Sequence, residues 1–338
     1  MRDLRSPPRK ASGLRSWTTQ QLSPIRDLPE QAGPGPNFLE KVTQLMVTSF
    51  SRDLRKGLAL VRGLALSRRA AADQPESRSS FDVSRFEVPA CPPNLQGVGK
   101  EQLIEWYWRV HPRFNFFKSV VPNARVLDLG AGKGGLPFWR QFLAPDRSDI
   151  HLFGIDLVKP LTAALYDDFR VADLNEGIPF PEAAFEAIIA SHILEHVNAP
   201  AEALAQVAKS LCGGGLAYVE MPSPTTKLLP TAAEYRAAGW PMTISNFHDD
   251  ATHRDTLEQE ALIRLADASG LRCLQAGYVS VPYLDHAMIA QGIAWNDAEI
   301  LLYGYWSATR WAQFAIFERT DGPAGGAQVN GLTNEHHD

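Results

Sequence analysis

Short apolar runs alternate with helical patterns between residues 100 and 319. The apolar runs predict strands at 125–129, 150–155, 169–171, 185–190, 216–221, 271–281 and 312–318. Helices are expected at 101–117 and, between strands, at about 134–143, 200–211 and 256–269. Strands that alternate with helices pair in parallel through right-handed crossovers. The pattern therefore predicts an α/β fold, a doubly wound sheet with helices on both faces.

The remaining segments lack this alternation. Residues 1–36 are rich in Pro, Ser, Arg and Gly, a composition typical of disorder. Residues 37–72 carry apolar positions three and four apart, clearest over 38–66, which predicts a basic amphipathic helix. Residues 73–99 contain several prolines and are expected to form a linker, and the Gly-rich 320–338 a disordered tail. We therefore expect one domain over 100–319.

Composition narrows the class of protein. The net charge is −5 over 338 residues, which argues against a generally basic nucleic-acid binder. Residues 1–72 nevertheless hold 13 Arg and Lys against 5 Asp and Glu, so a basic arm precedes an acidic body. The cysteines, at 91, 212 and 273, have no metal-site spacing, and no apolar run reaches the ~20 residues of a membrane span. We expect a cytoplasmic protein.

The basic helix at 38–66 has three interpretations that the sequence leaves open. It packs its apolar face on the domain, or it makes a peripheral contact with an anionic membrane surface. In the third interpretation it binds a partner helix or a nucleic-acid backbone. The oligomeric state is also left open.

The most informative segment is VLDLGAGKGG at 126–135, where a buried strand runs into a glycine-rich turn. Glycine lets a ligand approach the main chain closely. The loop also satisfies the GxGxxG dinucleotide pattern, so an NAD(P)-dependent oxidoreductase stays open. Asp128 favours another ligand, because a carboxylate at that point repels a pyrophosphate and attracts a cationic amino group and a sulfonium.

Further carboxylates follow the next two predicted strands. Asp156 ends the second strand, where a carboxylate can accept both hydroxyls of an adenosine ribose. Asp173 follows the third strand. Because the carboxyl ends of parallel strands meet at one sheet edge, we expect Asp128, Asp156 and Asp173 to cluster there.

With the runs FEAIIASHILEHV at 185–197, LCGGG at 211–215 and EMPSP at 220–224, residues 125–221 resemble class I S-adenosylmethionine-dependent methyltransferases of the type 11 group. The resemblance implies a Rossmann-like, seven-stranded sheet with an antiparallel last strand, and S-adenosyl-L-methionine as cofactor. It implies that the cofactor is bound by Asp128, Gly130, Ala131, Gly132, Gly134, Asp156, Leu157, Asp173, Leu174, Ser191 and His192. The loop 130–134 would hold the methionine part, Asp156 the ribose, and Asp173 and Leu174 the adenine edge. Only 17 residues separate Asp156 from Asp173, so the helix between them is expected to be short.

Methyl transfer from a sulfonium needs positioned reactants and, for a hydroxyl acceptor, a general base. It needs no metal, and we expect none. His253, oriented by Asp249 or Asp250, is the predicted base, and His192 is the second catalytic candidate, although cofactor contact is favoured for it. The other candidates are His196, which packs or caps locally in the competing interpretation, His248 and Glu220. Residues 248–254 could alternatively cap the following helix.

Two insertions, 223–255 and 282–309, are expected to build the acceptor pocket. The second carries aromatic residues that stack on an acceptor or belong to the core, namely Tyr283, Trp295, Tyr303, Tyr305 and Trp306. Ser-His-Ile-Leu at 191–194 replaces the Asn-Pro-Pro-aromatic tetrad of nucleic-acid amino methylation, which disfavours nucleic acid as a partner. Asp250-Ala251-Thr252-His253 resembles a segment of bacterial type 11 enzymes that act on sugars and glycolipids.

We therefore predict O-methylation of a small-molecule, saccharide or lipid-linked acceptor. Two alternatives remain, an NAD(P)-dependent oxidoreductase and a non-catalytic binding protein with the methyltransferase fold.

Overall fold

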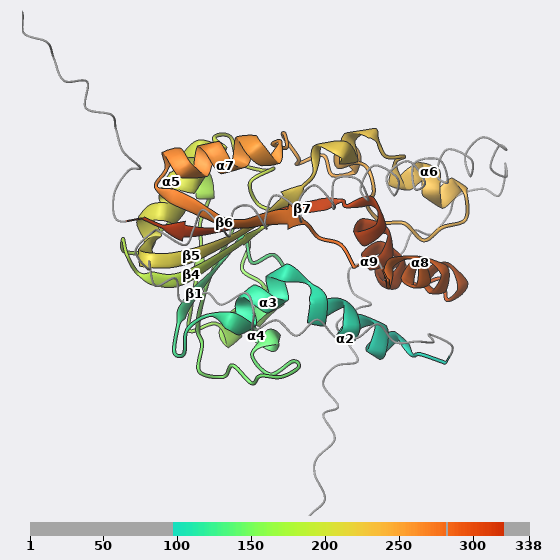
Figure 1. The fold of residues 1–338 in the computed structure, drawn as a ribbon, viewed down its shortest axis with the longest axis horizontal. Helices are drawn as coiled ribbons and strands as arrows, with labels where there is room; N and C mark the ends of the chain where they lie inside the picture. The colour runs from blue at the N-terminus through green and yellow to red at the C-terminus, as the bar shows by residue number, and fades with distance from the viewer. Residues whose placement is uncertain (1–96, 282, 321–338) are drawn as a thin grey trace, which may run out of the picture.

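The computed structural model describes residues 97–281 and 283–320 (Figure 1). The predictions for 1–36, for the basic helix at 37–72, for most of the linker at 73–99 and for the tail from 321 onward fall outside these residues. The interpretations of the 38–66 helix therefore stay predictions.

One seven-stranded sheet forms the centre of the domain (Figure 1). Its strands are β1 (Arg125–Leu129), β2 (His151–Asp156), β3 (Asp168–Val171), β4 (Phe185–Ser191), β5 (Leu211–Pro222), β6 (Leu271–Tyr278) and β7 (Ala312–Arg319). The order is β3-β2-β1-β4-β5-β7-β6, with β1 to β5 parallel and β7 antiparallel to both neighbours. The α/β, Rossmann-like fold with an antiparallel last strand is therefore confirmed.

Buried residues on both faces explain why the central strands read as continuous apolar runs. Leu127 and Leu129 of β1 pack in one core cluster with α5 (Pro200–Ser210) and α7 (Gln259–Ala268). Val126, which precedes them, packs in the opposite cluster with Phe116 and Phe117 of α3 (Pro112–Ser119). Figure 1 shows these helix layers on opposite sides of the sheet.

Two predicted helices differ from the observed ones. The stretch at 101–117 consists of α2 (Lys100–Val110) and α3, which meet at His111 because the Pro112 nitrogen has no hydrogen to continue a helix. The helix predicted at 134–143 was wrong in length, since α4 is only Leu136–Trp139 and loops follow it. Between β2 and β3 the chain forms only the 3-10 turn η4 (Leu161–Leu165), as the short spacing indicated.

The two insertions contain helices that the hydrophobic pattern had not indicated. The first holds η6 (Pro224–Leu228), α6 (Ala232–Ala237) and η7 (Phe247–Asp249), and the second α8 (Asp285–Ala294) and α9 (Ala298–Thr309). Both lie near the carboxyl edge of the parallel strands (Figure 1). α8 and α9 approach each other closely through Gly292 and Gly304.

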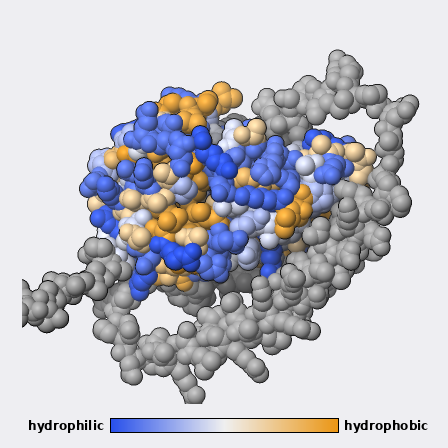
Figure 2. Space-filling view, turned by 90° about the horizontal axis from the view of Figure 1, so that it is seen from above, coloured by the Kyte–Doolittle hydropathy of each residue, from blue (hydrophilic) through white to orange (hydrophobic). Residues whose placement is uncertain are grey.

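The surface shows no sign of a bilayer-spanning element within the described residues. None of their helices combines the length and apolarity that crossing a membrane requires. Viewed from the side of α5 and α7, hydrophilic residues cover much of the described surface and hydrophobic ones form separate groups (Figure 2).

We predict that Gly304→Ala destabilises the protein, although Ala normally favours a helix over Gly by about 0.5–1 kcal/mol. The new Cβ would lie 2.6 Å from the Asp285 carbonyl oxygen and 2.7 Å from the Ile289 nitrogen, and such overpacking costs about 1–3 kcal/mol. Denaturant unfolding measures the change. Ala290→Gly on the exposed face of α8 is the control for intrinsic preference, and greater stability of Gly304→Ala would contradict the packing argument.

Candidate active site

The glycine-rich turn begins at the end of β1 and is tied to the end of β2. The backbone nitrogens of Gly130 and Ala131 both donate to the carbonyl of Ile155, at 3.0 and 2.9 Å. Gly130, Gly132 and Gly134 have φ values of 76°, 55° and 69°, which other residues rarely adopt. A Cβ on Gly130 would lie 2.9 Å from the Ile193 Cδ1 atom, whereas one on Gly132 would meet no atom of the described residues within 4 Å. The loop therefore packs on the protein at Gly130 and presents open backbone at Gly132.

Asp128 lies below this loop and is 8% exposed. Its Oδ2 atom accepts a hydrogen bond of 2.6 Å from the Tyr166 hydroxyl. Burial raises the pKa of the Asp128 carboxyl to about 6, against the smaller opposing effects of the Tyr166 hydrogen bond and the Arg113 charge. A cationic ligand beside Asp128 would stabilise its ionised form.

Asp156 at the end of β2 holds the glycine loop from the other side. Its Oδ2 atom accepts from the Gly132 nitrogen at 2.7 Å, and Oδ1 accepts from the Val158 nitrogen at 3.1 Å. The following residue, Leu157, is 65% exposed and makes no core contact. Asp156 is thus positioned beside the open backbone at Gly132.

Asp173 and Leu174 follow β3 and lie at the same edge. Asp173 caps η5 (Leu174–Glu176), because its Oδ1 atom accepts from the Asn175 nitrogen at 2.9 Å. The Leu174 side chain packs in the core with Leu129 and Ile155. The Leu174 side chain therefore belongs to the core. An adenine contact by the Leu174 backbone or by the Asp173 side chain stays a prediction.

His192 follows β4 in a left-handed conformation, with φ of 54°, and its ring lies between two buried carboxylates. Nε2 is 2.9 Å from the Glu220 Oε1 atom and Nδ1 is 3.1 Å from the Glu195 Oε1 atom. Burial alone would lower the pKa of His192, but the two carboxylates raise it to about 9. His192 is therefore an imidazolium at neutral pH and a poor proton acceptor, which favours its expected role beside the cofactor over that of a base.

Glu220 lies at the end of β5 and is 2% exposed. Its Oε2 atom accepts from the Tyr218 hydroxyl at 2.5 Å and lies 4.0 Å from the Arg113 Nε atom. Burial alone would raise the pKa of Glu220, but the charges of Arg113 and His192 hold it below its usual range. Glu220 is thus an ionised anchor in a charge network, a different role from the base considered for it.

Arg113 was not among the candidate site residues in the sequence. Its Nη1 atom donates to the Ser191 hydroxyl, and its guanidinium lies 5.6 and 5.5 Å from the ring centroids of Trp108 and Trp139. α3 thus directs a cation at the end of β4. A lone Arg beside a Pro carries no sequence pattern that distinguishes it from a surface residue.

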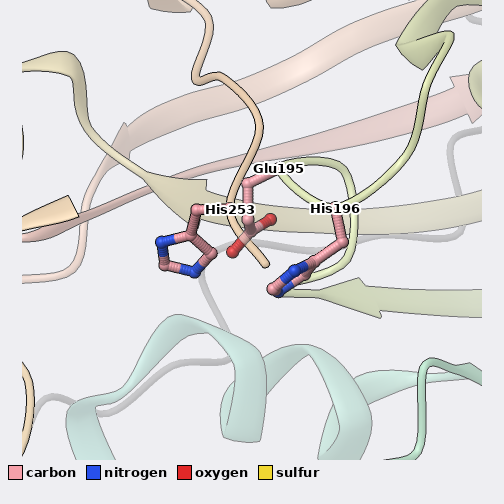
Figure 3. A group of neighbouring side chains, drawn as sticks. All are labelled: Glu195, His196 and His253. Atoms are coloured by element: carbon pink, nitrogen blue, oxygen red, sulfur yellow. The ribbon is translucent and has the colours of Figure 1, made fainter. Parts of the chain in front are cut away.

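The predicted base, His253, belongs to a second group of side chains. One ligand-type atom from each of Glu195, His196 and His253 lies within 4.8 Å of the others, and Figure 3 shows the carboxylate between the two rings. Glu195 also contacts His192, so this group adjoins the charge network of Glu220. His248, the remaining histidine candidate, is exposed and stands apart from the group.

The prediction that Asp249 or Asp250 orients His253 was wrong. Asp249 instead accepts hydrogen bonds from the backbone nitrogens of Ala232, Ser245 and Asn246. Asp250 is 3.9 Å from the Nε2 atom, too far for a hydrogen bond. The Phe247 carbonyl oxygen, 2.6 Å from Nδ1, orients the ring. The segment does not cap the next helix either, because α7 begins after Glu258.

The aromatic residues of the second insertion divide between core and site. Tyr305 is fully buried, and Tyr303 stacks on Tyr107 with ring centroids 4.5 Å apart. Trp306 stacks on Trp311, and both rings lie near His192, with centroids 5.8 and 5.5 Å away. Tyr283 and Trp295 are 38% and 43% exposed. Of the aromatic residues that were expected to stack on the acceptor, Trp306 is therefore the one that the fold brings to the site.

Residues 101–276, more than half of the chain, match the model of a methyltransferase domain family. The chain belongs to the class I S-adenosylmethionine-dependent methyltransferases. It is therefore an enzyme of this class, and the oxidoreductase and non-catalytic interpretations fall away.

The methyltransferase is similar in sequence to a ubiquinone biosynthesis O-methyltransferase of Xylella fastidiosa strain 9a5c. The two are 28% identical over 176 residues, 47% of this chain and 70% of the relative. The protein of the same description from strain M23 is 29% identical over 166 residues, 45% of this chain and 65% of the relative. The chain thus spans about two thirds of these relatives.

A solved structure of a Mesorhizobium loti S-adenosylmethionine-dependent methyltransferase is 17% identical, covers 67% of this chain and 100% of that chain, and has a TM-score of 0.43. The Burkholderia thailandensis 1,6-didemethyltoxoflavin-N1-methyltransferase, solved with bound 1,6-didemethyltoxoflavin and S-adenosylhomocysteine, is 16% identical. It covers 63% of this chain and 81% of that chain, with a TM-score of 0.40.

The methyltransferase uses S-adenosyl-L-methionine as cofactor. Its residues fit this molecule, because Gly132 leaves room for close approach and Asp128 is a buried carboxylate that contacts no cationic side chain in the part of the chain that the structure describes. Assignment of the individual contacts to Asp156, Ser191 and the other site residues stays a prediction.

We predict that Asp156→Ala weakens S-adenosylhomocysteine binding about 10- to 100-fold, because charged hydrogen bonds contribute about 1.5–3 kcal/mol. Loss of the Gly132 contact also loosens the loop. Isothermal titration calorimetry measures the affinity. Asp168→Ala, which removes a half-exposed carboxylate at the other end of the neighbouring strand, is the matched control and should bind normally. Equal affinity of both variants would remove Asp156 from the site.

We also predict that affinity for S-adenosylmethionine falls as the pH drops below about 6. The pKa of Asp128 is raised to about 6, so the free enzyme protonates this carboxyl there. The cationic cofactor favours the ionised form, so binding weakens toward tenfold per pH unit. Calorimetry from pH 5 to 8 measures this dependence. Asp128→Asn should bind more weakly at pH 7 and lose the pH dependence, and an unchanged slope would assign it to another group.

Proposed function

We propose that this methyltransferase transfers a methyl group to a hydroxyl oxygen of a small-molecule, saccharide or lipid-linked acceptor. The observation that carries the proposal is the geometry of His253. Its Nδ1 atom must carry the proton, because the Phe247 carbonyl can only accept. In the neutral ring the Nε2 atom is therefore the one that holds the lone pair, and the His253 side chain is 4% exposed.

A lone pair held in this position is useful for an oxygen acceptor. A neutral hydroxyl is a weak nucleophile until its proton is lost, whereas a neutral amine already has the attacking electron pair. The His253 ring lies beside Glu195, and Glu195 contacts His192 at the carboxyl edge of the sheet. His253 is thus the residue that prepares the acceptor oxygen, and His192 is a positioning residue.

The other site residues bind and orient the reactants. The bound cofactor supplies a methyl group on a good leaving group. The open backbone at Gly132 and the carboxylates of Asp128 and Asp156 would hold the cofactor. Arg113 and the cationic His192 neutralise Glu220, which keeps the end of β4 rigid and the reacting atoms aligned.

The acceptor class has two further supports. The relatives in Xylella fastidiosa are described as O-methyltransferases. In this chain, the partly buried Trp306 lies beside His192 and stacks on the buried ring of Trp311, and flat or ring-shaped acceptors pack well on an aromatic ring such as that of Trp306.

We predict that the enzyme transfers deuterated methyl groups from a labelled cofactor to hydroxyl oxygens, so that the products are methyl ethers. The enzyme is incubated with methyl-labelled cofactor and a small-molecule fraction of cell extract, and mass spectrometry locates the label. In a defined assay, catechol is compared with 2-aminophenol and aniline. Ether products support the proposal, whereas products labelled only on nitrogen overturn it.

His253→Gln should lower kcat about 100-fold or more, which is the usual effect of losing a group that assists proton removal. The affinity for S-adenosylhomocysteine should stay within about twofold, because the glycine loop is untouched. His248→Gln is the matched control, since His248 is exposed and five residues away in the same segment. Equal kcat values of the two variants would exclude His253 from this role.

A further inference from the structure

We propose that Glu195, His196 and His253 bind one divalent transition-metal ion, with zinc as the best-suited member of the class. This inference rests on the proposed O-methylation for its catalytic role, although the binding itself can be measured alone. The donor atoms of the three residues lie within 4.8 Å of one another. Ligands held about 2.0–2.2 Å from a common tetrahedral ion lie about 3.3–3.6 Å apart, so a bound ion would draw these side chains together by about 1 Å.

The hydrogen bonds of both rings leave the same nitrogen available. His253 Nδ1 donates to the Phe247 carbonyl. His196 Nδ1 is 3.0 Å from the Thr252 hydroxyl, which in turn donates its own hydrogen to the Asp250 Oδ1 atom at 2.6 Å. The Thr252 oxygen is thus an acceptor for His196. In the neutral rings both Nε2 atoms are therefore the ones that carry lone pairs, and a hydrogen bond from Nδ1 is the usual contact that orients a metal-binding histidine.

Glu195 provides the independent evidence for a ligand. Its side chain is completely buried, and one oxygen, Oε1, faces His192. The other, Oε2, has no hydrogen-bond partner among the described residues. A buried carboxylate oxygen left without a partner is costly, and an ion between the carboxylate and the two rings would satisfy it (Figure 3).

The two segments that carry the ligands are fixed to each other. The Arg254 backbone nitrogen donates to the Glu195 carbonyl at 2.8 Å, and the Arg254 Nε atom donates to the His196 carbonyl at 2.8 Å. The site is therefore preorganised before an ion binds, which favours affinity because little ordering remains to be done.

Two imidazoles and one carboxylate select the class of ion. Mg²⁺ and Ca²⁺ prefer oxygen ligands, whereas imidazole suits zinc and neighbouring transition metals. Three protein ligands leave a position open for an acceptor, as in catalytic zinc sites. An acceptor hydroxyl at that position has a lowered pKa and releases its proton to water. Its oxygen then bonds to the methyl carbon while the carbon–sulfur bond breaks, which yields a methyl ether, the demethylated cofactor and one proton. In this scheme His253 helps to prepare the acceptor oxygen by binding the ion.

The experiment uses the full-length chain with His336→Ala and His337→Ala, because this adjacent pair near the C-terminus is an obvious adventitious site. After treatment with a chelator and dialysis, the protein is titrated with Zn²⁺ by calorimetry and with Co²⁺ by visible absorption. We expect one ion per chain, with a Kd in the micromolar range or tighter. His253→Ala and Glu195→Gln should each weaken binding at least tenfold, and His248→Ala should not.

Binding of S-adenosylhomocysteine reports that each variant is folded. Should Glu195→Gln fail this check, His253→Ala and His196→Ala carry the test. Substoichiometric binding, or equal affinity of His253→Ala and His248→Ala, overturns the metal site and identifies any bound ion as adventitious. Methyl-ether formation by the chelated enzyme at an undiminished rate also overturns the catalytic role but leaves O-methylation standing. Metal binding with products labelled only on nitrogen would instead keep the site and remove the proposed function.

Discussion

The buried charge of Glu220 is the constraint on which the active edge of this methyltransferase depends. A carboxylate that is 2% exposed is stable only if cations and donors compensate it. Arg113, His192 and Tyr218 provide that compensation, and they come from α3, from the turn after β4 and from β5. Neutralising one charge therefore holds a helix and two strands together where the parallel strands end. The same requirement raises the pKa of His192 and lowers that of Glu220.

His192 links the charge network of Glu220 to the group formed by Glu195, His196 and His253. Its ring contacts Glu220 through one nitrogen and Glu195 through the other. One oxygen of Glu195 is used in this way, the second has no hydrogen-bond partner among the described residues, and the carboxylate lies beside His196 and His253. The position of the proposed metal ligands thus follows from the same buried network that shapes the cofactor edge. A residue that the sequence offered as a base serves in the structure as the link between the two halves of the site.

Local sequence patterns predicted most of the fold. Short apolar runs predicted the strands, and acidic residues at strand ends predicted the edge at which we expect the cofactor to bind, because both patterns depend on neighbours along the chain. The helix after the glycine loop was predicted too long, since Pro137 and the following loops end α4 after one turn. α8 and α9 were missed because apolar residues lie on most sides of both helices, so no continuous polar face reveals the helical period.

By itself, the sequence determined the sheet, the glycine turn, the acidic strand ends and the methyltransferase class, all of which are encoded over short stretches. Only the tertiary structure decided that Arg113 reaches the end of β4, that Phe247 rather than Asp249 orients His253, and that Glu195, His196 and His253 face one another. These contacts join segments far apart in the chain. They depend on how loops pack after the sheet has formed, and pairing across such distances leaves no periodic signal in a single sequence.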